Sequence, residues 1–503
     1  MKKGNFYLTT TLPYVNADPH IGFALEIVQA DVVARYHRLL GENVIFNTGT
    51  DEHGMKIYRK AQEEGKTPQE YCDYYAARFG QLKEALNLSY TNFIRTTDEE
   101  HVLAAQEFWK RCEANDDIYK KKYSVKYCVG CELEKTDSEL VDGKCPIHPT
   151  YELELIEEEN YFFRWSKYEQ ALLDLYEKNP NFVVPSNRLT EIKNFVQAGL
   201  QDFSISRLTE KMPWGVPVPG DDSQVMYVWF DALVNYISTL GWPENDANFE
   251  NFWPGVQVAG KDNLRQQSAM WQGMLLSAGL PHSEQIFIHG FITSGGQKMS
   301  KSIGNVINPL DIVEKYKTDP VRFFLLGALP AYDDGDFTVE RFEEYYTASL
   351  VNGIGNLTSR IVTMIEKYAD GKIPAVSEKE FFVVEKFWKE YEEKVQAYQF
   401  DALIFQIMQL VNQCDAIISE EKPWEAFKQG KDISELLYRL TETLRHLGLA
   451  LLPIMPEAAE KILNSLGIDL ETLGNLPEET VWGKLRAGTA IHKQDILFPR
   501  LTK

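Results

Sequence analysis

Strand-like and helix-like segments alternate at the start of the chain, and this order restricts the possible fold more than any other feature of the sequence. The expected elements are a strand at residues 6–12, a helix at about 23–40, a strand at 44–46 and helices from 55 onward. A strand–helix–strand–helix order is typical of an α/β domain built on a parallel sheet. Ligands of such sheets bind beyond the carboxyl ends of the strands. We therefore expect the loops at 14–20 and 50–54 to line one crevice.

Length and composition describe a multidomain globular chain. At about 150 residues per domain, 503 residues suggest roughly three or four units. Hydrophobic residues make up 44% of the chain, and no apolar run approaches the ~18 residues of a membrane span, so we expect a cytoplasmic protein without a membrane anchor. The net charge of −22 argues against coating of nucleic acid by bulk electrostatics. For the basic run at 120–122 we favour a solvated face, with a local phosphate contact as the alternative.

Composition divides the rest of the chain into further segments. After a first α/β segment at 1–115, residues 116–221 hold a cysteine cluster with Pro/Gly punctuation and are expected to form an inserted module. Apolar and aromatic residues return at 222–289, first at 225–230 and then in a strand-like run at 285–289, and we expect the sheet to resume there. Residues 290–345 carry a lysine-rich loop and a linking region.

The segment at 346–503 has a helical pattern throughout. Apolar residues recur at spacings of three and four, as at 403–417 and 437–451, and this periodicity predicts a helix bundle. Asp432 and Glu435 resemble a capping pair before the second stripe, and Pro453 is expected to end it.

Two close pairs of soft metal ligands occur in the inserted segment, Cys128 with Cys131 and Cys145 with His148. This doubled spacing is typical of zinc sites, and four protein ligands fill a tetrahedral ion without leaving a position for water. We therefore expect one structural Zn²⁺. The alternatives are a disulfide, which a cytoplasmic chain makes less plausible, or unpaired core cysteines. The cysteines outside this cluster, which we expect to be small core residues, are Cys72, Cys112 and Cys414.

A histidine signature and a lysine signature together predict an ATP site. His20 and Gly22 follow the first strand and open a helix, whose backbone N–H groups would face an anion. Lys298 and Lys301 flank Ser300 just after two glycines, as in a mobile loop that closes on phosphates. No serine or cysteine nucleophile accompanies them, so the site would act by positioning and by stabilising charge on phosphorus.

Other candidate residues are weaker by themselves. Residues 49–56 superficially resemble a P-loop, but Met55 stands where the phosphate-binding lysine belongs. Asp51 at a strand end suits an ammonium group, and a metal site formed with Glu52 and His53 lacks a partnered cluster in the sequence. Without further context the aromatic run at 227–236 would be ordinary core, and His289 an ordinary buried histidine.

Taken together, these motifs resemble the class I aminoacyl-tRNA synthetases, and among them the methionyl-tRNA synthetases of the bacterial type with a single zinc knuckle. The matching segments, in order along nearly the whole chain, are 12–16, 20–22, 48–54, the cysteine cluster, 202–207, 214–217, 227–232, 260–262 and 298–302. The resemblance implies a Rossmann-like catalytic domain with a zinc-knuckle insertion, followed by an all-α anticodon-binding bundle at 346–503. It also implies a ligase that activates methionine with ATP and transfers it to the 3′ end of methionine tRNA.

The resemblance further implies roles for individual residues. ATP phosphates would contact His20, Gly22, Lys298, Ser300 and Lys301, with Mg²⁺ carried by the nucleotide. Asp51 would bind the amino group of methionine, and the thioether pocket would be lined by Tyr14, Trp229, Ala232, Tyr236 and His289. Asn356 and Arg360 would touch anticodon bases and Trp424 would stack on one, although by itself Trp424 would be read as a half-buried helix-end residue. The insert at 116–221 is too small for the editing domain of relatives that handle branched amino acids.

Two departures from the family pattern leave alternatives open. Phe23 stands where the family often has a second histidine, and Gln266 with Gln267 stand where relatives commonly carry an aromatic residue and a histidine. A missing hydrogen-bond donor costs ~1–3 kcal/mol, which would slow adenylation without abolishing it. The alternatives are a catalytically attenuated tRNA-binding paralogue and a class I synthetase for another amino acid such as cysteine. The sequence ends at Lys503, and we expect a monomer.

Overall fold

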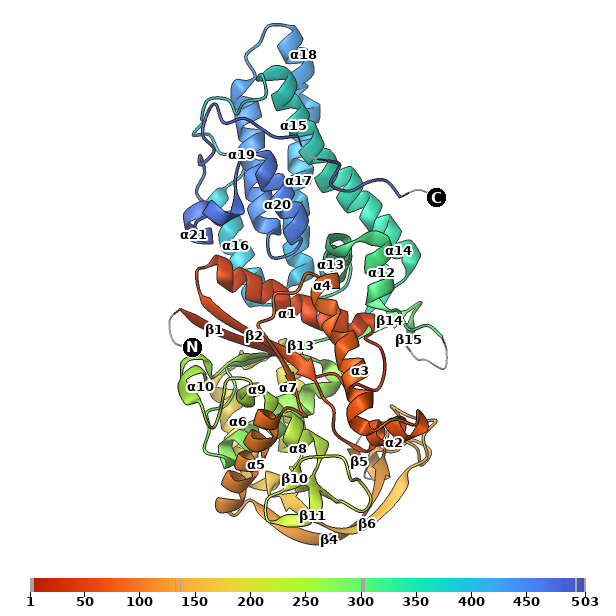
Figure 1. The fold of residues 1–503 in the computed structure, drawn as a ribbon. Coiled ribbons are helices and arrows are strands. Elements are labelled where there is room, and N and C mark those ends of the chain that lie inside the picture. Colours follow the sequence, from red (N-terminus) through yellow and green to blue (C-terminus); the bar gives the residue numbers. More distant parts are fainter. Residues whose placement is uncertain (1–3, 132, 136, 300–303, 494, 502–503) are drawn as a thin grey trace. The chain divides into compact units, whose positions relative to one another are not determined.

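The computed structural model describes residues 4–131, 133–135, 137–299, 304–493 and 495–501. The chain forms two compact units, each discontinuous in sequence (Figure 1). Unit 1 comprises Met1–Pro19, Val44–Gln81 and Tyr90–Ile288, and unit 2 comprises His20–Asn43, Leu82–Ser89 and His289–Lys503.

A six-stranded sheet with the order β3-β2-β1-β12-β13-β7 is the framework of unit 1. Its strands are β1 Asn5–Thr10, β2 Asn43–Thr50, β3 Asn92–Arg95, β7 Val183–Val184, β12 Val256–Gly260 and β13 Gln285–His289. The pairs β1 with β12, β2 with β3 and β13 with β7 are parallel. The parallel α/β sheet is therefore confirmed, as are the strands expected at 6–12, 44–46 and 285–289.

The sheet does not resume at 225–230 as we expected. Strand β11 (Asp221–Met226) ends there and belongs to a small antiparallel sheet with β9 (Ser206–Leu208) and β10 (Pro217–Val218). The aromatic run that follows forms helix α8 (Val228–Ala232), and the main sheet resumes at β12. A short apolar run fits a buried helix as well as a strand, so periodicity alone did not separate the two.

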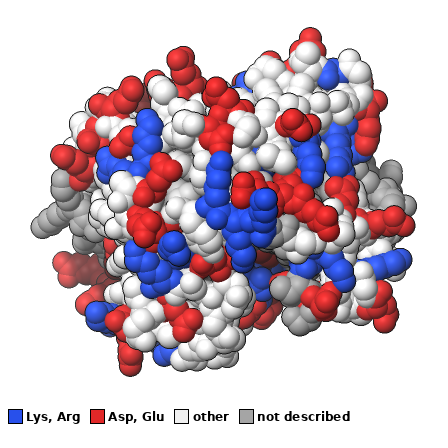
Figure 2. Space-filling model, turned by 90° about the horizontal axis from the view of Figure 1, so that it is seen from below, with Lys and Arg blue, Asp and Glu red and all other residues white. Residues whose placement is uncertain are grey.

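The segment at 116–221 contributes to more than one sheet. Strands β4 (Ile118–Cys128), β5 (Leu133–Lys135), β6 (Glu154–Phe163) and β8 (Phe203–Ser204) form an antiparallel sheet. Strand β7, however, belongs to the main sheet beside β13. In the basic run, Lys120 pairs with Asp221 at 2.7 Å. Figure 2 shows basic and acidic side chains interspersed on the face it displays, as expected for a solvated surface.

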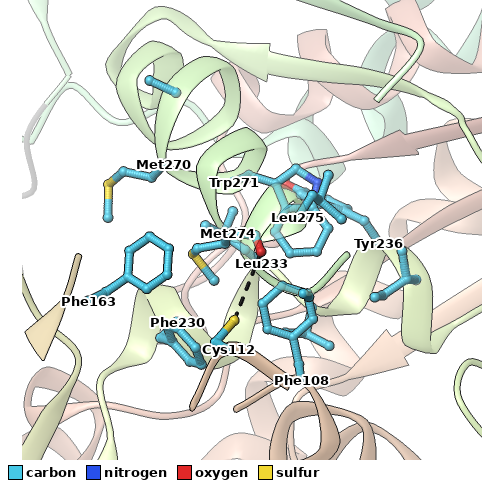
Figure 3. Packing of buried hydrophobic residues seen from close by; sticks show 14 of the residues in the cluster. Phe108, Cys112, Phe163, Phe230, Leu233, Tyr236, Met270, Trp271, Met274 and Leu275 are labelled. Atoms are coloured by element: carbon cyan, nitrogen blue, oxygen red, sulfur yellow. Dashed lines mark hydrogen bonds between the residues drawn. The ribbon is translucent and has the colours of Figure 1, made fainter. Parts of the chain in front are cut away.

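The core of unit 1 is rich in aromatic side chains. Figure 3 shows Phe230, Leu233 and Tyr236 from the α8 region packed with Phe108 and Trp271, and the Phe108 and Trp271 rings stack at 5.5 Å. The helices of unit 1 are α2 Met55–Glu63, α3 Pro68–Gly80, α5 Glu99–Ala114, α6 Glu169–Lys178, α7 Ser186–Gln197, α8, α9 Asn235–Ser238, α10 Asp246–Phe252 and α11 Trp271–Ser277, with a π-helical turn at Gln266–Met270. Helix α8 is therefore held in the core by the packing of its side chain Phe230.

Unit 2 is mainly helical. Its helices are α1 Ile21–Leu39, α4 Leu82–Ala85, α12 Pro309–Tyr316, α13 Thr318–Gly327, α14 Val339–Tyr345, α15 Asn356–Tyr368, α16 Val384–Gln396, α17 Phe400–Glu421, α18 Pro423–Lys428, α19 Ser434–Leu451, α20 Pro456–Ser465 and α21 Leu476–Glu479. Its strands are β14 Ile292–Ser294, β15 Gln297–Lys298 and β16 Gly335–Phe337. The helix bundle predicted from the apolar stripes is confirmed, with α17 and α19 carrying those stripes.

The predicted start of α19 is partly wrong. Asp432 does accept a hydrogen bond from the backbone N–H of Ser434 at 2.9 Å, but Glu435 pairs with Lys379 and does not complete a capping box. The helix ends at Leu451, just before Pro453. By length and composition alone, the stretch Phe400–Lys428 could cross a membrane, but 44% of its most apolar window is buried and core helices meet the same criterion.

A buried ion pair ties α1 to the helical unit. The carboxylate of Asp31 in α1 lies 2.8 Å from the guanidinium of Arg322 in α13, and both side chains are fully buried. Burial raises the pKa of Asp31, but Arg322 and Arg35 outweigh it and hold the pKa below its ordinary value. Arg322 also donates to the backbone carbonyls of Leu86, Pro453 and Ile454. These bonds fix the helix whose first turn carries the histidine signature.

Candidate active site and zinc site

His20 caps the N-terminus of α1. Its Nδ1 accepts a hydrogen bond from the backbone N–H of Gly22 at 3.1 Å, so that nitrogen carries no proton and the neutral ring carries its proton on Nε2. Desolvation of the ring lowers the pKa of His20 more than the charge of Glu26 raises it, although the residue as a whole is exposed. A neutral donor at the positive end of a helix suits a phosphate oxygen.

The lysine signature begins beside this helix start. A methyl group added at Gly22 would lie 2.9 Å from His20 Nδ1 and 3.9 Å from Cε of Met299. The backbone N–H of Ile21 donates to the carbonyl of Ile307 at 2.9 Å, so the chain beyond the signature also returns to α1. Lys298 is exposed on β15, with its Nζ 5.8 Å from the ring of Phe291. Ser300 and Lys301 lie outside the described residues.

In unit 1, the two loops at the carboxyl ends of β1 and β2 are joined by backbone contacts. Tyr14 and Asp51 form a parallel β-bridge, in which Asp51 N donates to Pro13 O at 3.0 Å and Val15 N donates to Asp51 O at 3.3 Å. Asp51 is 2% exposed. The structure therefore brings together the first two residues predicted to bind methionine, and it places the carboxylate of Asp51 in a desolvated setting where an ammonium group would be held strongly.

Helices α8 and α9 carry the remaining unit 1 residues that are predicted to line the methionine pocket. Trp229 is half-buried, while Ala232 and Tyr236 are buried. The hydroxyl of Tyr236 accepts a hydrogen bond from Nε2 of Gln267 at 2.7 Å, and its ring meets Trp271 edge-on at 5.9 Å. Gln267, one of the two departures from the family pattern, thus contacts a predicted pocket residue directly.

The residues next to Asp51 have structural partners. Glu52 is fully buried and accepts two hydrogen bonds from Arg95, at 2.7 and 2.9 Å. His53 Nδ1 lies 3.1 Å from one carboxylate oxygen of Asp231, and His101 Nε2 lies 3.6 Å from the other. This array was not predictable from the sequence, because the residues that meet come from positions 53, 101 and 231. No short-range pattern could reveal it.

His289 lies in unit 2 with α1. Its Nδ1 lies 2.7 Å from the carbonyl oxygen of Gly290 and its Nε2 lies 3.0 Å from a carboxylate oxygen of Glu26. Because a carbonyl oxygen can only accept, Nδ1 of His289 donates to Gly290. His289 thus has the contacts of a satisfied buried histidine, the simpler of its two interpretations, while its predicted part in the methionine pocket stays a prediction.

The four predicted metal ligands converge in the inserted segment. The ligand atoms of Cys128, Cys131, Cys145 and His148 all lie within 4.8 Å of one another. The sulfur atoms of Cys131 and Cys145 are 3.4 Å apart, well beyond the ~2.05 Å of a disulfide bond. This spacing fits tetrahedral zinc with Zn–S bonds of about 2.3 Å, and a methyl group at Gly130 would lie 2.6 Å from the His148 ring. Within the described ranges this is the one cluster of that kind.

The predicted anticodon residues lie on two helices of unit 2. Asn356 and Arg360 occupy the first turns of α15, where Arg360 makes an ion pair with Asp415 of α17. Trp424 is half-buried and follows Pro423 at the start of α18, directly after the sharp turn at Lys422. No contact between Trp424 and the α15 pair is recorded among the described residues, so their joint role stays a prediction.

Comparisons with known proteins agree with this arrangement. The family model described as tRNA synthetases class I (M) matches residues 6–152 and 150–362, and that of the anticodon binding domain of methionyl tRNA ligase matches 371–503. The methionine–tRNA ligase of Thermosynechococcus vestitus is 41% identical over 99% of this chain and 98% of its own length. That of Caldanaerobacter subterraneus is 41% identical over 100% of this chain and 79% of its own.

Solved structures match over the same extent. Mycobacterium tuberculosis methionyl-tRNA synthetase in complex with methionyl-adenylate superposes with a TM-score of 0.93 at 35% identity, covering 99% of this chain and 100% of that one. The apo form of that enzyme gives a TM-score of 0.86 at 32% identity, covering 99% and 98%. From its sequence and its fold, the chain belongs to the methionine–tRNA ligase family of class I aminoacyl-tRNA synthetases.

Proposed function

We propose that the chain activates methionine with ATP, forming methionyl-adenylate and pyrophosphate, and then transfers the methionyl group to the 3′ end of methionine tRNA. The observation that carries the proposal is the meeting of the two nucleotide signatures at the start of α1, where Gly22 separates the His20 ring from Met299. Methionine is proposed as the substrate because the relatives named above are methionine–tRNA ligases.

We assign each site residue a task in this reaction. The Nε2–H of His20 binds phosphate oxygens at the positive end of α1 beside Gly22, Lys298 and Lys301 neutralise the charge that develops as pyrophosphate leaves, and Ser300 contacts the phosphates. Asp51 holds the amino group of methionine, which fixes the carboxylate for in-line attack on the α-phosphorus. The protein therefore positions and stabilises, and the substrate carboxylate is the nucleophile.

The amino-acid side chain would lie among the rings and methyl groups predicted for its pocket. These are Tyr14, Trp229, Ala232, Tyr236 and His289. A polarizable sulfur is favoured at aromatic ring edges, and an unbranched chain fits where β-branched side chains do not.

Metal ions would have separate tasks. Cys128, Cys131, Cys145 and His148 would hold one structural Zn²⁺, since they fill all four positions and leave none for a substrate. That closed set also argues against the cysteine-specific alternative. Mg²⁺ would arrive with ATP, bound mainly by phosphates. We further propose that the enzyme works as a cytoplasmic monomer and reads the anticodon with Asn356, Arg360 and Trp424.

Methionine-dependent exchange of labelled pyrophosphate into ATP tests the proposal. Wild-type protein should support exchange with methionine and not with cysteine, and Lys301→Ala should slow exchange with little change in the KM for methionine. Lys317→Ala is a matched control, since it removes a lysine outside the signature. A folded, zinc-loaded wild-type sample without exchange would favour the attenuated paralogue, the alternative motivated by Phe23, which packs in the core at 9% exposure.

A further inference from the structure

An open cavity of about 320 Å³ lies in unit 1 beside β3, the edge strand of the main sheet. It is bounded by β3, the first turn of α5, the end of α9 and the segment that leads into α10 (Figure 1). Its lining, within the described residues, includes none of those predicted to bind ATP, methionine or zinc. A cavity of this size lies at the lower end of the range for small-molecule sites, ~300–1,000 Å³.

The lining favours a ligand with positive charge. Asp98 and Glu100, at the start of α5, contribute two carboxylates, and Asn245 and Asn248 contribute amide groups that can accept hydrogen bonds. In the part of the chain that the structure describes, no lysine or arginine lines the cavity. The N-terminus of α5 has the opposite sign, but a helix end carries only about half a unit charge, so the two carboxylates outweigh it.

Buried ionic side chains connect the wall of this cavity to the predicted methionine pocket. His101 lines the cavity and is fully buried, with Nδ1 lying 3.0 Å from Oγ of Ser238. Its Nε2 lies 3.6 Å from one carboxylate oxygen of Asp231, and the other oxygen lies 3.1 Å from Nδ1 of His53. Asp231 belongs to α8, the helix that carries two of the predicted pocket residues. The array therefore extends from the cavity to that pocket.

A second connection consists of hydroxyl and amide groups. Thr239 lines the cavity, where its hydroxyl accepts from Nδ2 of Asn92 and donates to Oδ1 of Asn47, both at 3.0 Å. Nδ2 of Asn47 donates to Oδ1 of Asn235 at 3.2 Å, and Nδ2 of Asn235 donates to the carbonyl of Ala232 at 2.6 Å. Asn47 and Asn235 are at most 2% exposed. This connection thus ends on a predicted pocket residue.

Helix α9 belongs to both sites. Ser238 and Thr239, at its end, line the cavity, and Tyr236, within it, is predicted to line the methionine pocket. A ligand that contacts the end of α9 therefore restricts the helix that holds Tyr236. When one ligand has already ordered a segment, a second ligand loses less conformational entropy on binding to it, and the two bind cooperatively.

We propose that this cavity is a regulatory site for a small organic cation with several ammonium groups, and that its occupancy tightens the binding of methionine. The coupling rests on the proposed function, because it takes Tyr236 and Ala232 as parts of the methionine pocket, whereas binding of the cation does not. Coupling between two sites is reciprocal, so methionine must tighten binding of the cation by the same factor. We expect a factor of about five or more.

Spermidine is the probe, and triethylene glycol, an uncharged chain of the same length, is its control. Isothermal titration calorimetry of the full chain at about 0.15 M salt measures binding while the more distant exposed charges are screened. ATP and tRNA are left out because they bind spermidine themselves. Glu100→Gln should weaken spermidine binding about three- to fivefold, the contribution of one exposed ion pair. Glu99→Gln, which removes the same charge outside the lining, should change it by less than about 1.5-fold.

Two tryptophan variants of α10 test the cavity itself. Asn248→Trp fills the mouth of the cavity and leaves its charges in place, so it should abolish binding of spermidine. Asn251→Trp makes the same exchange on α10 outside the lining and should bind spermidine as the wild type does. Both positions are exposed, so neither exchange disturbs the core.

Equilibrium dialysis of labelled methionine measures the coupling. The Kd for methionine should fall about fivefold with saturating spermidine in the wild type and in Asn251→Trp, and it should stay constant in Asn248→Trp. Spermidine binding that survives in Asn248→Trp, or a methionine Kd that spermidine leaves unchanged, would overturn the inference. Spermidine binding by a wild-type protein that neither binds methionine nor supports pyrophosphate exchange would instead overturn the proposed function, and the coupling with it, while the cation site would stand.

Discussion

Asp319, the second residue of α13, is a carboxyl group that the fold holds away from water. Burial raises its pKa to about 6, although the backbone N–H of Ala458 donates to it at 2.6 Å. Between pH ~4, near the pKa of an unfolded Asp, and pH ~6, the folded state binds more protons than the unfolded state, so stability falls as the pH rises. Above pH ~6 the buried carboxyl group is ionised in the folded state, and this lowers the free energy of unfolding by an amount on the order of 2–3 kcal/mol.

We therefore predict that Asp319→Asn changes the pH dependence of unfolding. The wild-type Tm should drop by several degrees more than that of the variant between pH 5 and pH 8, as measured by calorimetry at matched ionic strength. Asp311→Asn, which neutralises an exposed carboxyl group in α12, serves as the control and should follow the wild type. Parallel curves for Asp319→Asn and wild type would show that Asp319 stays ionised throughout.

The pKa of Asp231 shifts in the opposite direction to that of Asp319, because its partners are histidines, so we predict the opposite dependence of stability on pH. Burial alone would raise the pKa of Asp231, but His53 and His101 lower it below its ordinary value. Its contribution to stability is therefore present above pH ~4 and lost as the pH falls through the lower folded value. Breaking a buried pair costs about 3–5 kcal/mol.

Asp231→Asn should consequently lower the Tm at pH 7 by roughly 5–10 °C. Because Asp231 lies between Trp229 and Ala232 in α8 and contacts His53 beyond Asp51, the variant should also raise the KM for methionine more than that for ATP. Asp246→Asn, at an exposed position of α10, is the control. Equal increases in both KM values would mean that the array supports the fold as a whole.

These residues also show what the sequence could reveal. The zinc ligands were predictable because zinc sites use ligand pairs at fixed short spacings, which are visible in the linear sequence. These ligands are Cys128, Cys131, Cys145 and His148. The Gln267–Tyr236 bond and the Asp231 array join residues 31 to 178 positions apart. The packing of the whole unit determines which of these residues meet. Without the fold, each of them would be interpreted as an ordinary buried polar residue.

At the scale of elements, a continuous apolar run set off from its surroundings decided which strands of the sheet were predictable. Strands β1, β2 and β13 each carry three consecutive apolar residues and were expected. Strand β7 has two residues and β12 follows a loop with the same apolar character, so neither stands out from its neighbours. Register within the sheet depends on which face each strand buries, and in a parallel sheet the partner strands are far apart in the sequence.

The predicted zinc knuckle, formed by Cys128, Cys131, Cys145 and His148, is an element whose order should depend on bound Zn²⁺. It joins β4 and β6, whose long antiparallel ladder continues away from the knuckle, from Tyr127 opposite Glu154 to Ile118 opposite Phe163. Chelation of Zn²⁺ should raise amide exchange first in residues 128–151 and leave the amides of α19 protected. Hydrogen exchange read by mass spectrometry measures both regions in one sample.

A matched pair of thiol variants tests the same element. Cys131→Ser should lower bound zinc well below about one ion per chain, whereas Cys112→Ala, at a fully buried thiol outside the cluster, should leave zinc content unchanged. Protection in residues 128–151 that survives full removal of zinc would show that the knuckle folds without the ion.

At the scale of the whole molecule, the family matches separate synthesis of the adenylate from recognition of tRNA. The synthetase model covers residues 6–362 and the anticodon model covers 371–503. Amino-acid activation needs ATP and methionine alone, while charging needs the tRNA as well. A residue that acts only on the anticodon should therefore affect the second reaction and spare the first.

Trp424→Ala provides that test. Stacking of a base on an aromatic ring contributes ~1–3 kcal/mol, so the kcat/KM for tRNA charging should fall about 10- to 100-fold while methionine-dependent pyrophosphate exchange stays within about twofold. Phe405→Ala removes another aromatic side chain of the bundle, 64% exposed on α17, and should leave both reactions unchanged. Equal losses in charging and exchange would make Trp424 a structural residue at the start of α18, as its half-buried position allows. A loss confined to charging would instead place a tRNA contact on the short helix that Pro423 begins, because only charging requires the tRNA.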